Sequence, residues 1–164
     1  MMKKIIATIS ILLVCFTMLI GCSKDPVQED LINYINNQLP TIVELESKVT
    51  TEYEASTGNN FVDDDTIAKR LKDVIIPASD ELLAKSKAIV PATEEVKKVH
   101  NKYIASITEQ NEALNMLLLA ASKHDEAMVK TVNEKLANSD KISNEYVSEV
   151  EALKKEHNVV SEKK

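Results

Sequence analysis

The sequence predicts an all-α protein, specifically an antiparallel up-down-up-down four-helix bundle. The first observation is the scarcity of glycine, since the 164 residues contain only Gly21 and Gly58. β-sandwiches and α/β sites use glycine repeatedly in turns and phosphate loops. The second is the recurrence of apolar residues at steps of three or four through four segments of roughly 25 to 30 residues. The third is the short stretch of turn-forming residues between successive segments.

The first predicted helix begins at Asp25 and runs to about Ser56. Asp25 is a favourable N-cap, Pro26 suits the first helical position, and Gln28 can complete a capping box. One face of this helix carries the apolar or large residues Val27, Leu31, Ile35, Leu39, Ile42, Val49 and Tyr53. We expect that face to be buried.

The second predicted helix follows the turn "STGNNFVDDD" and ends before Pro91. Gly58 fits a left-handed C-terminal cap, and Asp63 to Asp65 supply the next N-cap. The predicted buried face consists of Ile67, Leu71, Val74, Ala78, Leu82 and Ile89.

The third helix is predicted to be capped by Thr93, with Glu94 and Glu95 in the first turn, where the helix dipole favours acidic groups. Its buried face is predicted to contain Val96, Val99, Tyr103, Ile107, Leu114, Leu117 and Ala121.

The fourth helix is predicted to start after a turn at "SKHDE", with Ser122 or Asp125 as its cap, and to fray after His157. Its face consists of Met128, Val132, Leu136, Ile142, Tyr146, Val150 and Leu153, and a loose tail is expected from about residue 158.

Two prolines, Pro40 and Pro77, fall inside the first and second helical patterns. Each lacks an amide hydrogen and so frees the carbonyl one turn earlier, at Asn36 and Asp73. Both prolines are about equally far from the joint between the two helices. We therefore predict proline bends at Pro40 and Pro77 that lie at the same level of the bundle.

The N-terminal segment has the pattern of a signal peptide, because Lys3 and Lys4 precede a short apolar run that ends at Ile20. The next residues, Gly21 and Cys22, complete "LIGC", which resembles a bacterial lipobox. The resemblance implies cleavage between Gly21 and Cys22 and attachment of a diacylglyceryl group, with fatty acyl chains such as palmitate, to the Cys22 thiol. The expected organisation is a signal peptide at residues 1–21 and a single domain at 22–164.

The composition limits the classes of partner. Removal of residues 1–21 takes away Lys3 and Lys4, which changes the net charge from −6 to −8. An acidic domain is repelled by anionic lipid, so the membrane contact is expected to come from the lipid on Cys22. Nucleic-acid binding is not expected for the same reason. Only about three residues separate Cys22 from the first helix, so the domain should lie close to the membrane.

The sequence contains no recognisable catalytic or metal-binding motif. None of His100, His124 and His157 has Glu three residues before it, as a di-iron bundle requires. There is no His-Glu-x-x-His, thiolate pair, phosphate loop or nucleophile elbow. We expect no enzyme activity, no catalytic residues, no metal and no cofactor, and His100 is interpreted as a partly exposed or hydrogen-bonded residue.

Two groups of acidic residues could in principle form a binding site. The run from Asp63 to Thr66 has the charge of a cation site but lacks the spacing of a calcium loop, so helix capping is the preferred interpretation. The acidic residues of the first helix are interpreted as a solvated face; these are Glu44, Glu46, Glu52 and Glu54.

The stretch "LNMLLLAAS" suggests a binding surface. Met116 and Leu119 point away from the predicted buried face at Leu117, at roughly 100° and 200° around the helix. A helix that is apolar on all sides is either enclosed by several neighbours or contacts a partner. Both interpretations are kept, and Met116 with Leu119 is the candidate partner patch.

The chain also resembles small all-helical lipoproteins of Bacillus-type bacteria with no assigned activity, through the lipobox, "DLINYINNQLP" and "SKHDEAMVKTVNEKLANSDK". This implies a lipid-anchored protein on the outer face of a Gram-positive membrane, or in the periplasm of a cell with two membranes. The expected function is a non-catalytic module that binds a protein or an envelope component. The alternatives are an immunity or accessory protein for a secreted toxin, and a ligand-scavenging lipoprotein.

Overall fold

A computed structural model describes residues 25–160, and every regular element in that range is a helix. The prediction of an all-α fold is thus confirmed for this part of the chain. The predictions for Gly21 and Cys22 lie outside the described residues. The elements are α1 (Pro26–Asn33), η1 (Tyr34–Gln38), α2 (Pro40–Glu54), η2 (Gly58–Asn60), α3 (Asp64–Arg70), η3 (Leu71–Ile75), α4 (Ile76–Ala88), α5 (Glu94–Lys123) and α6 (Glu126–Glu156).

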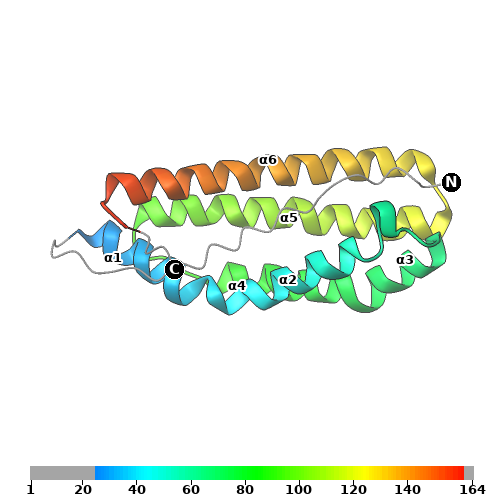
Figure 1. Ribbon diagram of the computed structural model, residues 1–164, viewed down its shortest axis with the longest axis horizontal. Coiled ribbons are helices and arrows are strands. Elements are labelled where there is room, and N and C mark those ends of the chain that lie inside the picture. The colour runs from blue at the N-terminus through cyan, green and yellow to red at the C-terminus, as the bar shows by residue number, and fades with distance from the viewer. Residues whose placement is uncertain (1–24, 161–164) are drawn as a thin grey trace.

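The two longest helices, α5 and α6, run side by side along the length of the molecule (Figure 1). The segments α1 to α2 and α3 to α4 extend alongside them, and both α3 and α4 contact α5. The resulting shape is elongated (Figure 1). None of the helices within residues 25–160 combines the length and apolar character that crossing a bilayer requires.

The interior consists of two hydrophobic clusters that follow one another along the molecule. One cluster joins α2, α3 and η3 to the second half of α5 and the first half of α6. The other joins α1, η1 and α4 to the first half of α5 and the second half of α6. All seven residues predicted for the buried face of the third helix are at most 5% exposed, which confirms that face.

The predicted buried face of the second helix is wrong at Val74, and Ile89 at its end is only partly buried. Val74 is half-exposed, whereas its neighbour Ile75 is only 1% exposed. The cause is η3, a π-helical segment with a wider turn that contains an additional residue. The widened turn shifts the inward position by one residue and continues the buried series from Leu71 to Ile75 and Ala78.

Both interior prolines follow a π-helical segment. η1 ends at Gln38, two residues before Pro40, and η3 ends at Ile75, two residues before Pro77. The π-type bond from the Leu39 amide to the Tyr34 carbonyl is 2.9 Å long. Since proline has no amide hydrogen, the normal helical bond is missing at each of these positions.

Three predicted aspartate caps are confirmed. Asp25 accepts hydrogen bonds from the amides of Val27 and Gln28, and Asp125 accepts from those of Ala127 and Met128. Asp63 accepts from the amide of Thr66. Ser122, the alternative cap of the fourth helix, lies inside α5.

The predicted N-cap position of Thr93 is confirmed, but its side chain, like that of Gln28, binds a partner elsewhere in the fold. Thr93 occupies the N-cap position of α5, but its hydroxyl donates to Asp30 at 2.7 Å. Gln28 does not complete a capping box, since its amide donates to the His157 carbonyl at 2.6 Å.

The long helices α5 and α6 both end in a left-handed residue other than glycine. These residues are His124, with φ 51°, and Asn158, with φ 53°. The amide of the following residue returns to a carbonyl five positions earlier, from Asp125 to Ala120 and from Val159 to Lys154. This is the Schellman arrangement. Val159 is 8% exposed, so the chain remains packed at the start of the predicted tail.

Candidate functional site

The two residues of the candidate partner patch line the same surface groove. Met116 and Leu119 of α5 are joined there by Met128 of α6, and the groove has a volume of about 380 Å³. Asn111, Glu112 and Asn115 form the remainder of its lining. The helical spacing of four places Asn111, Asn115 and Leu119 in one row of α5 and Glu112 with Met116 in the next.

The apolar residues of the groove are exposed to different extents. Leu119 is 51% exposed and is one of the most exposed large hydrophobic side chains in residues 25–160. Met116 and Met128 are half-buried and pack against the neighbouring core cluster. The groove therefore has a methionine floor that continues into the core and a leucine that projects into solvent.

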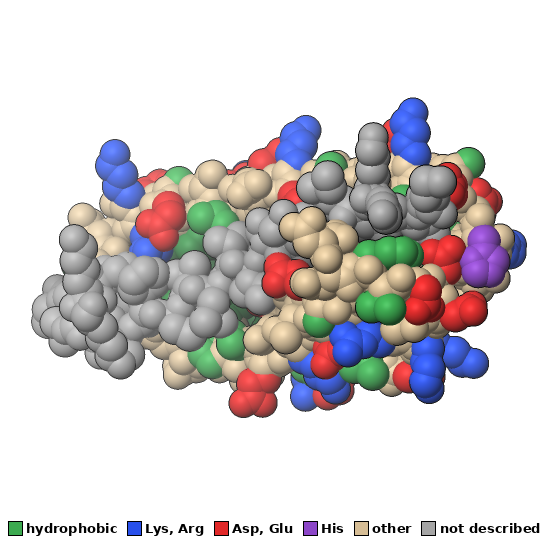
Figure 2. All heavy atoms as spheres, turned by 45° about the vertical axis from the view of Figure 1, so that its right-hand side comes forward, with side chains coloured by type: hydrophobic (Ala, Val, Ile, Leu, Met, Phe, Trp, Pro, Cys, Tyr) green, Lys and Arg blue, Asp and Glu red, His purple; other side chains and the backbone are tan. Residues whose placement is uncertain are grey.

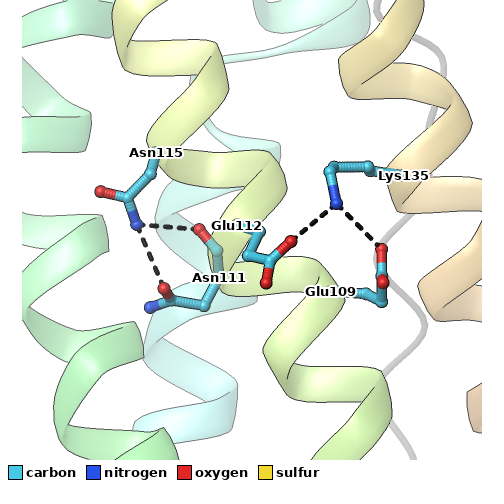
Figure 3. Close-up of polar contacts among 5 residues, drawn as sticks. All are labelled: Glu109, Asn111, Glu112, Asn115 and Lys135. Atoms are coloured by element: carbon cyan, nitrogen blue, oxygen red, sulfur yellow. Dashed lines mark hydrogen bonds and ion pairs between the residues drawn. The ribbon is translucent and has the colours of Figure 1, made fainter.

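Amide side chains border the groove on the side that faces α4. The Asn115 Nδ2 donates to the Asn111 carbonyl at 2.9 Å and to the Asn111 Oδ1 at 3.1 Å (Figure 3). The Asn111 Nδ2 in turn donates to Asp80 at 2.8 Å and to Ser79 at 3.1 Å. These bonds fix both amides against α4 and α5.

A charged cluster borders the groove on the side that faces α6. Lys135 of α6 donates to Glu112 at 2.7 Å and to Glu109 at 3.3 Å, as Figure 3 shows. The hydrogen bond with Glu112 raises the pKa of Lys135, so the ammonium remains charged at neutral pH. Glu112, the one carboxylate in the groove lining, is therefore paired with the Lys135 ammonium.

This combination suits recognition of an apolar side chain. Methionine is unbranched and polarisable, and it adapts to partners of different shape. Convergent amides at the rim can fix the orientation of a bound polar backbone. On the face in Figure 2, acidic and basic side chains are intermingled around small hydrophobic patches. Within the groove itself, three apolar residues lie beside two amides and one carboxylate.

The sequence indicates only part of the groove. The apolar periodicity predicts Met128 on the buried face of the fourth helix, and it predicts no function for Asn111 and Asn115. The spacing of Asn111, Asn115 and Leu119 places these residues in one row, which is a signal available from the sequence. The contribution of Met128 depends on the packing of α6 against α5 and has no local signature.

His100 is a buried, hydrogen-bonded residue, and it is not part of the groove. It is 2% exposed, its Nε2 lies 2.9 Å from the Ser86 carbonyl, and its Nδ1 lies 3.1 Å from the Tyr34 hydroxyl. Since a carbonyl only accepts, Nε2 carries the hydrogen. Burial lowers the pKa of His100, which keeps the ring neutral. The Tyr34 hydroxyl therefore donates to Nδ1, and the Tyr146 hydroxyl donates to Tyr34 across 3.2 Å.

Glu46 differs from the solvated face predicted for the acidic residues of the first helix. Its side chain is half-buried, and burial raises its pKa to about 7. Its charge also contributes to the raised pKa values of Tyr34, Tyr103 and Tyr146. Glu46 therefore belongs with the buried aromatic cluster around His100.

The acidic run at Asp63 acts as a helix cap. The Asp63 carboxylate accepts from the Thr66 amide at 2.7 Å and from the Thr66 hydroxyl at 2.9 Å. These bonds lower the pKa of Asp63. Asp64 instead contacts His124 at 2.9 Å, and this contact raises the pKa of that histidine. Among residues 25–160, no three His, Cys, Asp or Glu side chains are arranged to hold a metal ion.

Comparison of the chain with protein-family models, with curated proteins and with solved structures found no match.

Proposed function

We propose that the protein is a lipid-anchored, extracytoplasmic lipoprotein that acts as a non-catalytic binding module at the cell surface. The lipobox supports the anchor on Cys22 after cleavage at Gly21, and the resemblance to Bacillus-type lipoproteins supports the outer face of a Gram-positive membrane. The single observation that carries the binding role is that Met116 and Leu119 line one groove. Its partner is another protein or an envelope component.

A non-catalytic role is supported by the use of the three histidines within the fold. His100 joins η1 to α4, His124 contacts Asp64 at the start of α3, and His157 contacts Asp25 at 2.8 Å. Each of these contacts stabilises the association of separate elements. General acid–base catalysis would need such a ring to face a substrate within hydrogen-bonding reach.

We also propose that the helical segments form the antiparallel up-down-up-down four-helix bundle, with bends at Pro40 and Pro77. A π-helical segment directly before each proline supports this, because prolines and π-bulges are the usual causes of helix kinks. Bends lie at the same level if the two axes change direction at equal distances from Gly58. A crystal structure with straight axes through both prolines would contradict this part of the proposal.

The test of the binding role is crosslinking on intact cells, followed by identification of the captured molecules. The variant Met116→Lys with Leu119→Glu should retain its helical circular dichroism and its lipid but lose the specific crosslink. Leu119→Glu alone is the milder variant, because Leu119 is 51% exposed. The matched control is Val62→Glu, which changes a 69% exposed residue outside the groove and should retain the crosslink.

Two further results would contradict the proposal. Cys22→Ala should release the protein or leave its signal peptide uncleaved, so a variant that is processed and membrane-bound to the wild-type extent argues against the anchor. Turnover of an envelope substrate by the purified domain, lost on changing a single His, Glu or Asp, argues against a non-catalytic role.

A further inference from the structure

The N-terminal half of α1 holds the α4–α5 connection in place. The Asp30 carboxylate accepts from the Ala92 amide at 3.0 Å and from the Thr93 amide and hydroxyl at 2.7 Å each. Asp30 is only 6% exposed, so this contact is an internal joint of the fold.

The N-cap and first turn of α1 hold the end of α6. Asp25 contacts the His157 ring at 2.8 Å, and this hydrogen bond lowers the pKa of Asp25. Gln28 donates to the carbonyls of His157 and Asn158 at 2.6 and 3.4 Å. The start of α1, the α4–α5 connection and the end of α6 therefore meet at one end of the molecule, and we call residues 25–30, 89–93 and 157–160 the anchor end.

Two exposed valines belong to the anchor end. Val90 is 72% exposed and Val160 is 69% exposed, and they are among the four most exposed large hydrophobic side chains in the described range. Single exposed apolar residues are common on protein surfaces. Val90 lies two residues before Ala92, whose amide is hydrogen-bonded to Asp30 of α1. Val160 lies three residues after His157, whose carbonyl is hydrogen-bonded to Gln28 of α1. Both valines are therefore held at the same end of the molecule as the start of α1.

The proposed lipid attachment restricts where the anchor end can lie. Cys22 and Asp25 are three residues apart, so even a fully extended chain separates them by no more than roughly 10 Å. The opposite end of the molecule carries Val62 and the α5–α6 turn. The 31 residues of α6 place that end about 45 Å further away.

We propose that the anchor end rests on the lipid bilayer, with Val90 and Val160 inserted at the boundary between headgroups and acyl chains. This inference rests on the proposed lipidation of Cys22. Two valine side chains bury too little area to bind a membrane alone. A covalent lipid already holds them at the surface at high effective concentration, so they determine the orientation of the domain rather than its attachment.

The test uses three single-cysteine variants of the lipidated full-length protein, Val90→Cys, Val160→Cys and Val62→Cys. Val62 is a matched control because it is 69% exposed, as Val160 is, and lies at the opposite end. The thioether blocks Cys22, so the new cysteine is the only free thiol of the mature chain. Each is spin-labelled and reconstituted into vesicles of phosphatidylethanolamine and phosphatidylglycerol.

Accessibility to a water-soluble nickel relaxation agent should fall several-fold at positions 90 and 160 on reconstitution, while oxygen accessibility rises there. Position 62 should remain unchanged. If the protein floats with vesicles but positions 90 and 160 behave like 62, or all three are shielded equally, the anchor end does not face the lipid. If mass spectrometry finds no lipid on Cys22 and the protein does not float, the anchor itself is wrong, and this inference falls with it.

Discussion

Ser106 of α5 and Ser139 of α6 exchange hydrogen bonds across the interface between the two longest helices. The Ser106 hydroxyl donates to the Ser139 carbonyl at 3.0 Å, and the Ser139 hydroxyl donates to the Ser106 carbonyl at 2.9 Å. Both residues are 5% exposed. Small side chains at this position let the two backbones approach closely enough for each hydroxyl to reach the opposite helix.

This pair gives the first prediction. Ser106→Ala and Ser139→Ala should each lower the free energy of unfolding by about 1 kcal/mol, since each removes one buried hydrogen bond. Ser106→Leu should cost more, about 1–3 kcal/mol, because the larger side chain forces the helices apart. Urea denaturation measures all three variants. If Ser106→Leu is as stable as the wild type, the close approach of α5 and α6 is wrong.

The second prediction concerns the hydrogen-bond directions around His100. Tyr34→Phe leaves the buried Nδ1 of His100 and the Tyr146 hydroxyl without a partner, and it should cost about 1–3 kcal/mol of stability. Tyr146→Phe removes only the bond donated to Tyr34 and should cost about 1 kcal/mol. Thermal denaturation compares the two variants. The reverse order would contradict a hydrogen-bond chain in which Tyr34 lies between His100 and Tyr146.

The third prediction concerns pH and Glu46. Its pKa is raised from 4.5 to about 7, so the folded protein binds more protons than the unfolded chain between these values. Its contribution to the free energy of unfolding therefore falls as the pH rises through this window. His100, with a lowered pKa, acts in the opposite direction and costs stability as the pH falls below 6.5.

Glu46→Gln should accordingly be more stable than the wild type at pH 8, by on the order of 1–3 kcal/mol, and the difference should disappear toward pH 5. Urea unfolding from pH 5 to 8 measures it. Glu44→Gln is the control, because Glu44 is exposed two residues away on the same helix. A difference that does not depend on pH would show that Glu46 does not titrate in this window.

The fourth prediction compares two leucines on α5. Leu117 is 0% exposed, and Leu117→Ala should lower the free energy of unfolding by about 2–5 kcal/mol. Leu119 is 51% exposed, and Leu119→Ala should change it by less than about 0.5 kcal/mol. Equal losses in chemical denaturation would place Leu119 in the core and remove the basis for the groove as a binding surface.

The fifth prediction concerns the end of α6. Asn158 adopts φ 53°, a conformation that alanine tolerates poorly and glycine adopts freely. Asn158→Ala should cost about 1 kcal/mol, and Asn158→Gly should be neutral or slightly stabilising. Melting temperatures of the two variants provide the measurement. An alanine variant as stable as the glycine variant would contradict the left-handed cap.

The fold class and much of the core could be predicted from sequence, because they depend on local periodicity. The face of α5 is the clearest case, since its apolar residues recur from Val96 to Ala121 with only the buried Gln110 interrupting the series. The aspartate caps at Asp25 and Asp63 were also predictable, as each side chain binds an amide two or three residues away.

The features that sequence reasoning missed depend on distant partners. Thr93 has the right residue type for a cap, but Asp30, 63 positions earlier, binds its hydroxyl instead. In the same way, the Gln28 side chain donates to the His157 carbonyl at the end of α6, and so it does not form the capping box. Burial of Glu46 likewise depends on its neighbours in space. The groove was found only in part because its floor needs a residue from α6.

The π-helical segments have a consequence for sequence comparison. Each widened turn contains one more residue than the α-helical turn it replaces, so the chain carries one additional position near 34–38 and another near 71–75. A homologue with regular helices at these places would be shorter by one residue in each. Alignments of this chain should therefore be allowed single-residue gaps inside helices there, where gap penalties are normally highest.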